Sequence, residues 1–358
     1  MAAGNTIAKL FVELGFKDAK FKAGMTSAEA SVKRFGNTAN GMSNWIGNQL
    51  KRSFMAAGAS AVAFGVSTLK AGAAFEQAMA TIQAITKMTA DEFDATSKAA
   101  RHLGATTLFT ATEAAEAMQE FARAGMKSNE IIEASGPALM FAGAAGASMK
   151  QSTSLLAATL RQFNLDASES ARVADVFTAS VNNSMLDITK LTEAMKFAGT
   201  TGAAFGMSLE ETSAAVGMFA NLGLEGSMAG TNFRMAMIQA AKSSQKKEKV
   251  MASLGMTMKE INPEFNSFED IMLKVASSGM TATQAIEIFG ARSGANVFAL
   301  AQQMGEGSKE FDKLTDSIVN SAGTTAETYE TMINTVQGKT GILKSTIQEV
   351  QISLFEGM

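Results

Sequence analysis

Few side chains in this 358-residue chain have the chemistry that catalysis or tight metal binding requires. The chain contains no cysteine and a single histidine, His102. Zinc sites built from nitrogen and sulfur ligands, and Cys-His or Ser-His-Asp catalysis, therefore lack essential groups. His102 lies in the stretch Lys-Ala-Ala-Arg-His-Leu-Gly at residues 98–104, which is typical of a helix end, where a cation is favoured by exposed carbonyl groups. We interpret it as a capping or solvated residue rather than a general base.

Paired carboxylates are the remaining route to acid–base chemistry. Glu113 with Glu116, and Glu210 with Glu211, are spaced closely enough to be considered as such pairs. Glu113 and Glu211 also occupy positions that cap helices, and this structural role already explains them. We therefore expect no catalytic, cofactor-binding or metal-binding residue, and no enzyme activity.

Three glycine-rich stretches superficially suggest phosphate-binding loops. They lie at residues 199–202, 223–226 and 305–309. None follows a predicted strand, and none has the full spacing of a phosphate-binding loop, so we expect turns between helices.

Capping signals outline the elements that carry these residues. A Ser, Thr or Asp is followed three positions later by an acid or, in one case, by Gln, then by a mostly apolar stretch that in several cases ends at a Gly or Asn, as expected for short capped helices. The predicted starts are Thr89 with Glu92, Thr110 with Glu113, Asp166 with Glu169, Ser208 with Glu211, Ser267 with Asp270, and Thr281 with Gln284. The predicted stops are Gly125, Asn164, Gly199 and Gly223. Pro137 is expected to start or kink the helix that carries Leu139 and Met140.

Composition favours the same fold class. Hydrophobic residues make up 46% of the chain, with 25 Met and 23 Phe but only two prolines, and Ala and Met favour helices. The net charge is −3 and the sequence pI is near 5.5, so the chain lacks the basic surface of a sequence-specific nucleic-acid reader. The mixed run at residues 242–249 is expected to be a solvated turn.

Four segments can be distinguished along the chain. Residues 1–53 contain an alternating stretch at 7–14, which predicts one β-strand, and a basic amphipathic helix from Phe21 to Ile46. Residues 54–72 form an apolar helix rich in small residues, whose uncharged stretch 54–69 is short for a membrane span. A buried or self-associating helix is favoured there, and insertion of 54–69 into a membrane is the alternative. Residues 73–310 form a helical core, and 311–358 a heptad-bearing helix.

The C-terminal pattern is a heptad seam. Its positions are separated by alternating steps of three and four residues, and all but one are apolar. They are Ile333, Val336, the polar Thr340, Leu343, Ile347, Val350 and Leu354. We expect a coiled-coil-forming helix with a bend at Gly338 and Gly341. The seam is still running near Met358, so we expect the native chain to continue. The predicted fold is mainly α: an array of short packed helices or hairpins with one N-terminal strand and this C-terminal helix.

A long ordered series of motifs adds a resemblance. It runs through Ala-Phe-Glu-Gln-Ala-Met at 74–79, the stretch 103–118, Phe-Ala-Arg-Ala-Gly at 121–125, Leu-Asp-Ala-Ser-Glu at 165–169, Arg-Val-Ala-Asp at 172–175, Thr-Glu-Ala-Met-Lys at 192–196, Gly-Met-Ser-Leu-Glu-Glu-Thr at 206–212, Gly-Ser-Met-Ala-Gly-Thr at 226–231 and Ile-Phe-Gly-Ala-Arg at 288–292. In order and spacing, residues 70–345 resemble the conserved core of bacteriophage tail tape measure proteins. No single motif is specific alone, and none carries a catalytic residue.

The resemblance implies a structural role in a phage or prophage tail. Such a protein occupies the lumen of the tail tube in the virion, sets tube length during assembly in the bacterial cytoplasm, and leaves ahead of the genome. It implies contacts with the tail tube protein, tail assembly chaperones and baseplate or distal tail hub proteins, a homo-oligomer, and transient contact with the host membrane. Because the predicted helices are short and interrupted, this segment is expected to be an end domain rather than the measuring rod.

Overall fold

The computed structural model describes residues 58–305 and 309–356, and these residues are almost entirely helical. They form fifteen α-helices, α3 to α17, with two short 3₁₀ turns and no β-strand. The mainly α prediction is confirmed. The predicted strand at 7–14 and the basic helix after Phe21 lie outside the described residues.

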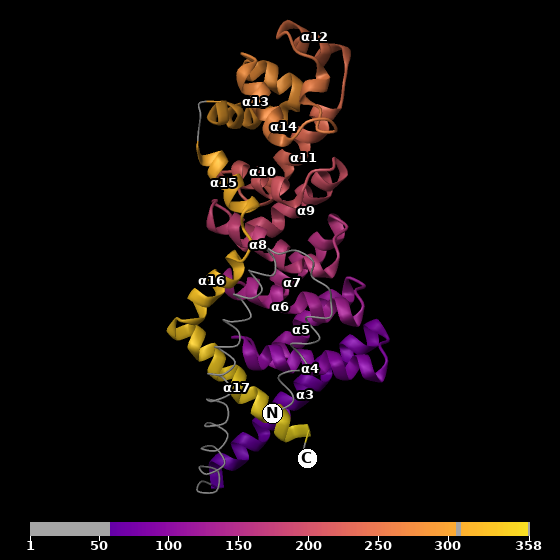
Figure 1. The fold of residues 1–358 in the computed structure, drawn as a ribbon, viewed down its shortest axis with the longest axis vertical. Coiled ribbons are helices and arrows are strands. Elements are labelled where there is room, and N and C mark those ends of the chain that lie inside the picture. Colours follow the sequence, from indigo (N-terminus) through magenta and orange to yellow (C-terminus); the bar gives the residue numbers. More distant parts are fainter. Residues whose placement is uncertain (1–57, 306–308, 357–358) are drawn as a thin grey trace.

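Twelve helices follow one another along an elongated column, which we call the stack (Figure 1). Its elements are α3 (Gly58–Thr86), α4 (Ala90–Thr106), α5 (Ala111–Arg123), α6 (Ser128–Ala144), α7 (Met149–Gln162), η1 (Ala167–Glu169), α8 (Ser170–Asn182), α9 (Ile188–Ala204), α10 (Leu209–Asn221), α11 (Ser227–Ala241), α12 (Gln245–Ser253), η2 (Met258–Ile261), α13 (Phe268–Ser277) and α14 (Ala282–Gly305). Gly290 has φ 84° and kinks α14.

Three further helices, which we call the strap, return along one side of the stack (Figure 1). They are α15 (Lys309–Val319), α16 (Thr324–Ile333) and α17 (Val336–Glu356). The first packs on α8 and α10, the second on α6 and α8, and the third on α3 and α4. The strap thus brings residues near 350 back to the beginning of the described chain.

Most predicted helix starts are confirmed. Thr89 and Thr110 form complete capping boxes with their acidic partners, and Ser208, Ser267 and Thr281 engage the expected residues. Asp166 is different, because its side chain makes no capping hydrogen bond. The short 3₁₀ turn η1 follows it and leads into α8.

Left-handed residues end several helices, as predicted for Gly125, Asn164 and Gly223, whose φ angles are 78°, 51° and 85°. The prediction for Gly199 is wrong, because α9 continues to Ala204. Gly199 is buried in this helix, and a Cβ there would lie 2.1 Å from Gln162 Oε1. Because Gly199 has no side chain, α9 can pack closely against Gln162.

Two other local predictions are corrected. Pro137 lies inside α6, which begins earlier at Ser128, so it does not start that helix. The run at 242–249 is only partly a turn, because α12 begins at Gln245. Lys247 is 8% exposed, and its ammonium group donates to the carbonyl and side-chain oxygens of Gln239. These hydrogen bonds satisfy the buried ammonium group of Lys247, so α12 can form within the charged run.

A continuous apolar core runs along the stack and includes side chains of the strap. Its largest buried residues are phenylalanines: Phe121, Phe141, Phe177, Phe219, Phe233, Phe268 and Phe289. Leu314 and Ile318 of α15, and Ile352 of α17, belong to the same core. The strap is therefore part of the folded body and does more than touch its surface.

The predicted C-terminal seam is divided in the structure. Ile333 ends α16 and is buried, whereas the rest of the seam lies on α17 after a break at residues 334–335. The bend predicted at Gly338 and Gly341 is wrong, because both lie within α17. Without side chains they approach the backbone of α16 and of Leu108 closely.

The apolar segment predicted at 54–72 does not end as a separate helix. Its described part belongs to α3, which continues without a break to Thr86. In residues 58–305 and 309–356 no helix combines the length and apolar character needed to cross a membrane.

Candidate functional site

His102 lies near the C-terminal end of α4, one residue before its last turn, and its side chain is exposed. The nearby protein removes part of the water around the ring, and this desolvation lowers the pKa of its imidazole. The ring is therefore neutral at pH 7, which argues against the cationic capping role. No carboxylate or hydroxyl of the described residues forms a hydrogen bond with it, so the arrangement of a catalytic base with its orienting acid is not formed there.

The two carboxylates of the first candidate pair are used separately. Glu113 accepts hydrogen bonds from the amide of Thr110 at 2.7 Å and from its hydroxyl at 2.8 Å. Burial raises the pKa of Glu113, but these bonds and the nearby Lys344 outweigh burial, and the pKa is lowered overall. Glu116 is exposed on the same helix. The pair is thus a capping residue beside a solvated one.

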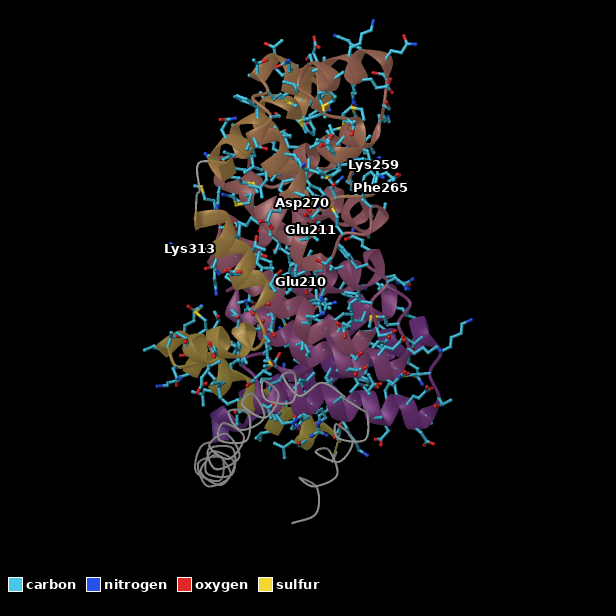
Figure 2. All side chains as sticks on the ribbon, turned by 45° about the horizontal axis from the view of Figure 1, so that its top comes forward. Glu210, Glu211, Lys259, Phe265, Asp270 and Lys313 are labelled. Carbon is cyan, nitrogen blue, oxygen red and sulfur yellow. The ribbon has the colours of Figure 1, made fainter. Side chains whose placement is uncertain are left out.

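The second candidate pair, labelled in Figure 2, is also divided between two partners. Glu210 pairs with the guanidinium group of Arg172. Glu211 reaches across the stack and accepts from the backbone amide of Phe268, the first residue of α13, at 2.6 Å. Burial raises the pKa of Glu211, and the nearby Asp270 adds to this effect. Glu211 therefore contacts the start of another helix and does not complete its own capping box.

The structure also shows where the three glycine-rich stretches lie. Residues 199–202 are inside α9, which corrects the expectation of a turn, and residues 223–226 form the expected turn between α10 and α11. Residues 306–308 lie outside the described residues. Within the described ranges, no three Asp, Glu or His side chains gather as a metal-binding group.

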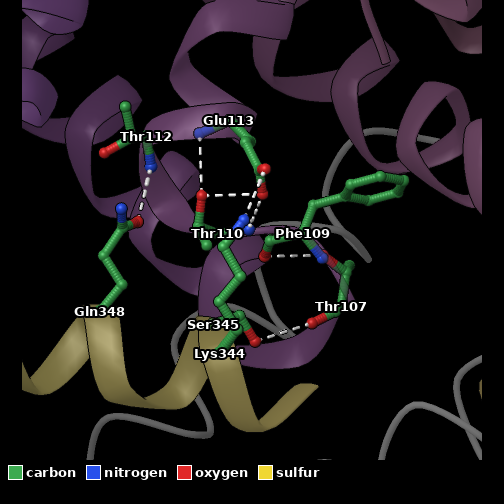
Figure 3. A network of polar contacts seen from close by, with 8 residues as sticks. All are labelled: Thr107, Phe109, Thr110, Thr112, Glu113, Lys344, Ser345 and Gln348. Carbon is green, nitrogen blue, oxygen red and sulfur yellow. Dashed lines mark hydrogen bonds and ion pairs between the residues drawn. The ribbon is translucent and has the colours of Figure 1, made fainter. Parts of the chain in front are cut away.

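A polar cluster joins the strap to the turn between α4 and α5, and we call it the clasp (Figure 3). Lys344 pairs with Glu113 at 3.1 Å, so the capping carboxylate also holds the strap. The other contacts are Thr112 N donating to Gln348 Oε1 at 3.2 Å, Ser345 Oγ donating to the carbonyl of Thr107 at 3.1 Å, and Leu108 N donating to the hydroxyl of Tyr329 at 3.0 Å.

A second contact holds the end of the strap. Arg101 of α4 donates to Glu349 Oε1 at 2.8 Å and to Ser353 Oγ at 2.6 Å, and it also pairs with Glu356. Burial raises the pKa of Glu349, while the pairing with Arg101 partly offsets this. The acidic side chains of α17 thus face the stack and are bound there.

A third contact fixes the beginning of α16. Asp175 of α8 accepts from the backbone amides of Gly323 at 2.8 Å and Thr325 at 2.9 Å; Gly323 is the N-cap residue of α16 and Thr325 lies in its first turn. Burial raises the pKa of Asp175 despite these bonds. The carboxylate supplies the acceptor that the start of a helix requires.

These contacts were not predicted from the sequence, because their partners are more than 140 residues apart. The only signal in the chain was the polar series Ser345 and Gln348 between the apolar residues of α17. These contacts join helices. None of the side chains in them forms an activated nucleophile or an open set of metal ligands.

Residues 97–294, more than half of the chain, match the family model described as phage-related minor tail protein. The chain belongs to this family. The matched region runs from α4 into α14, so the family region coincides with most of the stack.

Two curated relatives refine the assignment of this minor tail protein chain. A tape measure protein of Pneumococcus phage Dp-1 is 32% identical over 295 residues, which cover 81% of this chain and 25% of the relative. A probable tape measure protein of Escherichia phage P2 is 29% identical over 304 residues, covering 82% and 37% respectively. The matched part of the chain thus spans 25% of the first relative and 37% of the second. No solved structure matches it significantly.

Proposed function

We propose that this chain is the folded part of a tail tape measure protein, which sets tail length during assembly and plugs the tube until genome ejection. The observation that carries the proposal is the similarity of four fifths of the chain to two proteins with that name. The structural, non-enzymatic role belongs to the same proposal, and the name that both relatives carry supports it.

The folded arrangement suggests how the work is divided. An extended helix rises about 1.5 Å per residue, so a measuring segment gains most length as one long rod. Here short helices fold back on one another, and the strap returns along them (Figure 1). We propose that the body expected at residues 73–310 is a plug or attachment unit, and that measurement depends on other parts of the full protein.

The proposed site of action is the tail lumen of the virion, after synthesis in the bacterial cytoplasm. The proposed partners are the tail tube protein, tail assembly chaperones and baseplate or distal tail hub proteins, with more than one copy of this chain in each tail. The supporting observation is the family assignment, because minor tail proteins are by description parts of phage tails.

Cross-linking of intact tails tests this placement. Lysine cross-links between this chain and the tail tube protein are expected in filled virions and should disappear after DNA ejection is triggered. A major capsid protein provides the internal control, since its cross-links should persist. Equal cross-linking before and after ejection would contradict the plug, and absence of the chain from purified tails would contradict the whole proposal.

An enzymatic role is tested separately. The purified chain should not degrade cell-wall peptidoglycan, and Glu113→Gln and Glu211→Gln should leave any background signal unchanged. Cell-wall degradation that either variant abolishes would show that the carboxylates do more than bind helix ends.

A further inference from the structure

One apolar face of α17 remains uncovered in the structure. We call it the outer seam, and it consists of Val336, Thr340, Leu343, Ile347, Val350 and Leu354. Val336 is 84% exposed, Leu343 is 41% exposed and Leu354 is 43% exposed, whereas Ile347 and Val350 are half-buried. The opposite side of the same helix is buried against the stack. The helix therefore has one face for its own chain and a second that is unpartnered in it.

The outer seam has the geometry of a helix-binding surface. Its residues are separated by alternating steps of four and three, the spacing that presents one continuous stripe to a neighbouring helix. From Val336 to Leu354 the stripe is about 27 Å long, which corresponds to nearly three heptads. The side chains that pack on the stack, including Ile342, Ser345 and Ile352, lie about half a turn away from it.

The charges of α17 are segregated in relation to this stripe. On a helical wheel, Lys339 and Lys344 lie on opposite flanks, about 60° and 80° from its centre. Lys344 contacts Glu113 but remains 67% exposed. Glu349 and Glu356 point away from the stripe and are bound by Arg101. The flanks of the outer seam are therefore basic.

This pattern argues against a second copy as the partner. In a parallel pair of identical helices, Lys339 of one would lie beside Lys344 of the other, and the remaining flanking residues, Gln337, Thr346, Gln351 and Ser353, carry no charge. An antiparallel pair would again bring together only lysines or neutral residues. Like charges at these positions disfavour association, whereas Glu or Asp from a different helix would form pairs with both lysines.

We propose that the outer seam is the docking surface for an amphipathic helix of another protein, one with a heptad apolar stripe and acidic flanks. The new helix packs on α17 from outside while the clasp still holds α17 on the stack. Apolar burial supplies most of the affinity, and the two lysines select the acidic partner. This inference concerns a surface and a partner class, and it does not depend on the measuring role.

A peptide-binding experiment with the whole chain tests the proposal. The probe is a fluorescent four-heptad peptide with Ile and Leu in its stripe and Glu at every flanking position, and the matched peptide carries Lys at those positions. Fluorescence anisotropy should show binding of the acidic peptide and at least about tenfold weaker binding of the basic one. Raising the salt concentration should reduce this difference, because exposed charge pairs are screened.

Variants locate the binding surface. The double variant Leu343→Gln, Leu354→Gln should weaken binding of the acidic peptide about tenfold or more, because each leucine loses apolar burial. Phe265→Gln is the matched control, since Phe265 is 62% exposed elsewhere on the stack (Figure 2), and its binding should be unchanged. Lys339→Glu should weaken the acidic peptide about two- to fivefold and strengthen the basic one. Circular dichroism checks that each variant keeps its fold.

Several results would overturn the proposal. These are absence of binding, equal binding of the two peptides, or undiminished binding by the double leucine variant. Sedimentation of the chain without peptide gives the remaining test: a dimer that the double leucine variant abolishes would assign the outer seam to a second copy. The expected result is a chain whose oligomeric state the double leucine variant leaves unchanged and which binds only the acidic peptide through these leucines.

Discussion

Glu113 and Glu211 show how one residue type acquires opposite properties in similar sequence contexts. Both follow a Ser or Thr by three positions. Glu113 closes its capping box and also binds Lys344, which together lower its pKa. Glu211 is buried against the start of α13, and burial raises its pKa. Sequence spacing predicted the first arrangement, but it contained no sign of Phe268, which is 57 residues away from Glu211.

The two carboxylates should therefore respond oppositely to pH. Glu113 has a lowered pKa, so it stabilises the fold above its unfolded pKa of about 4.5, and this contribution is lost as the pH falls through the lower folded value. Glu113→Gln should lower the urea midpoint at pH 7, and its difference from the unmodified chain should shrink below about pH 4.5. Glu116→Gln, at an exposed position, is the control and should have little effect.

Glu211 has a raised pKa, so its contribution to stability is present at low pH and is lost as the pH rises through the folded value. Gln is neutral at every pH and still accepts the hydrogen bond from Phe268. Glu211→Gln should therefore leave the urea midpoint at pH 7 unchanged or raise it. A clear loss of stability at pH 7 would show that the ionised carboxylate itself is needed.

The structural role of a glycine is also difficult to predict from the local sequence. Gly125 and Gly223 end helices as predicted, whereas Gly199 lies inside one. The residue type permits both roles, because glycine adopts a left-handed conformation and also lets helices approach. Only the neighbouring helix decides between them, and the local sequence does not identify that neighbour.

Two glycine substitutions separate close packing from helix propensity. Gly230 of α11 faces α9, and a Cβ there would lie 2.1 Å from the carbonyl oxygen of Ala194. Since backbone cannot move aside easily, Gly230→Ala should destabilise the chain by about 1–3 kcal/mol. Gly136 has only an ordinary 3.9 Å contact with Leu103, so Gly136→Ala should be neutral or stabilising by up to about 1 kcal/mol. Urea denaturation measures both, and equal effects would contradict the packing explanation.

At the scale of elements, local chemistry predicted the stack better than the strap. Side chains a few residues apart cap most helices of the stack, so their starts were visible in the sequence. The strap depends on Asp175, Arg101 and the α4–α5 turn, which its own sequence does not contain. The seam in α17 was also recognised, but the helix packs on the stack through a different face.

Tyr329 tests how firmly the strap is held. It is the only tyrosine in the chain, and burial raises its pKa to about 12 while its hydroxyl accepts from the amide of Leu108. Tyr329→Phe leaves that amide without its acceptor and should cost about 1 kcal/mol at pH 7. Hydrogen exchange should be faster at Leu108 in the variant and unchanged at amides within α13.

The same tyrosine gives a pH dependence with a defined direction. Its pKa is raised from 10.0 to about 12, so the stabilisation it provides is complete below about pH 10 and is lost as the pH rises through 12. The difference in urea midpoint between the unmodified chain and Tyr329→Phe should narrow over this range. A constant difference would show that the phenol is not buried in solution.

At the scale of the whole molecule, the stack and strap form an elongated unit with one main apolar core and two smaller clusters. The mainly α class and the apolar core followed from composition and capping. The return of the strap did not, because it depends on contacts between distant parts of the chain. This return matters for function, since a chain that doubles back covers less length than the same residues in a single helix.

A deletion in the phage gene tests whether this unit measures the tail. Removing α9 and α10 with their connection takes out about 35 residues, and in a continuous helical ruler this would shorten the tail by roughly 50 Å. Because these helices belong to the common core, we expect failed assembly or leaking genomes instead, with no population of normal tails shortened by that amount. A deletion of equal size in a predicted long helix elsewhere in the full gene is the control and should shorten the tail. Electron microscopy of tail lengths decides the question: viable tails shortened by about 50 Å after the first deletion would show that the stack itself is the ruler.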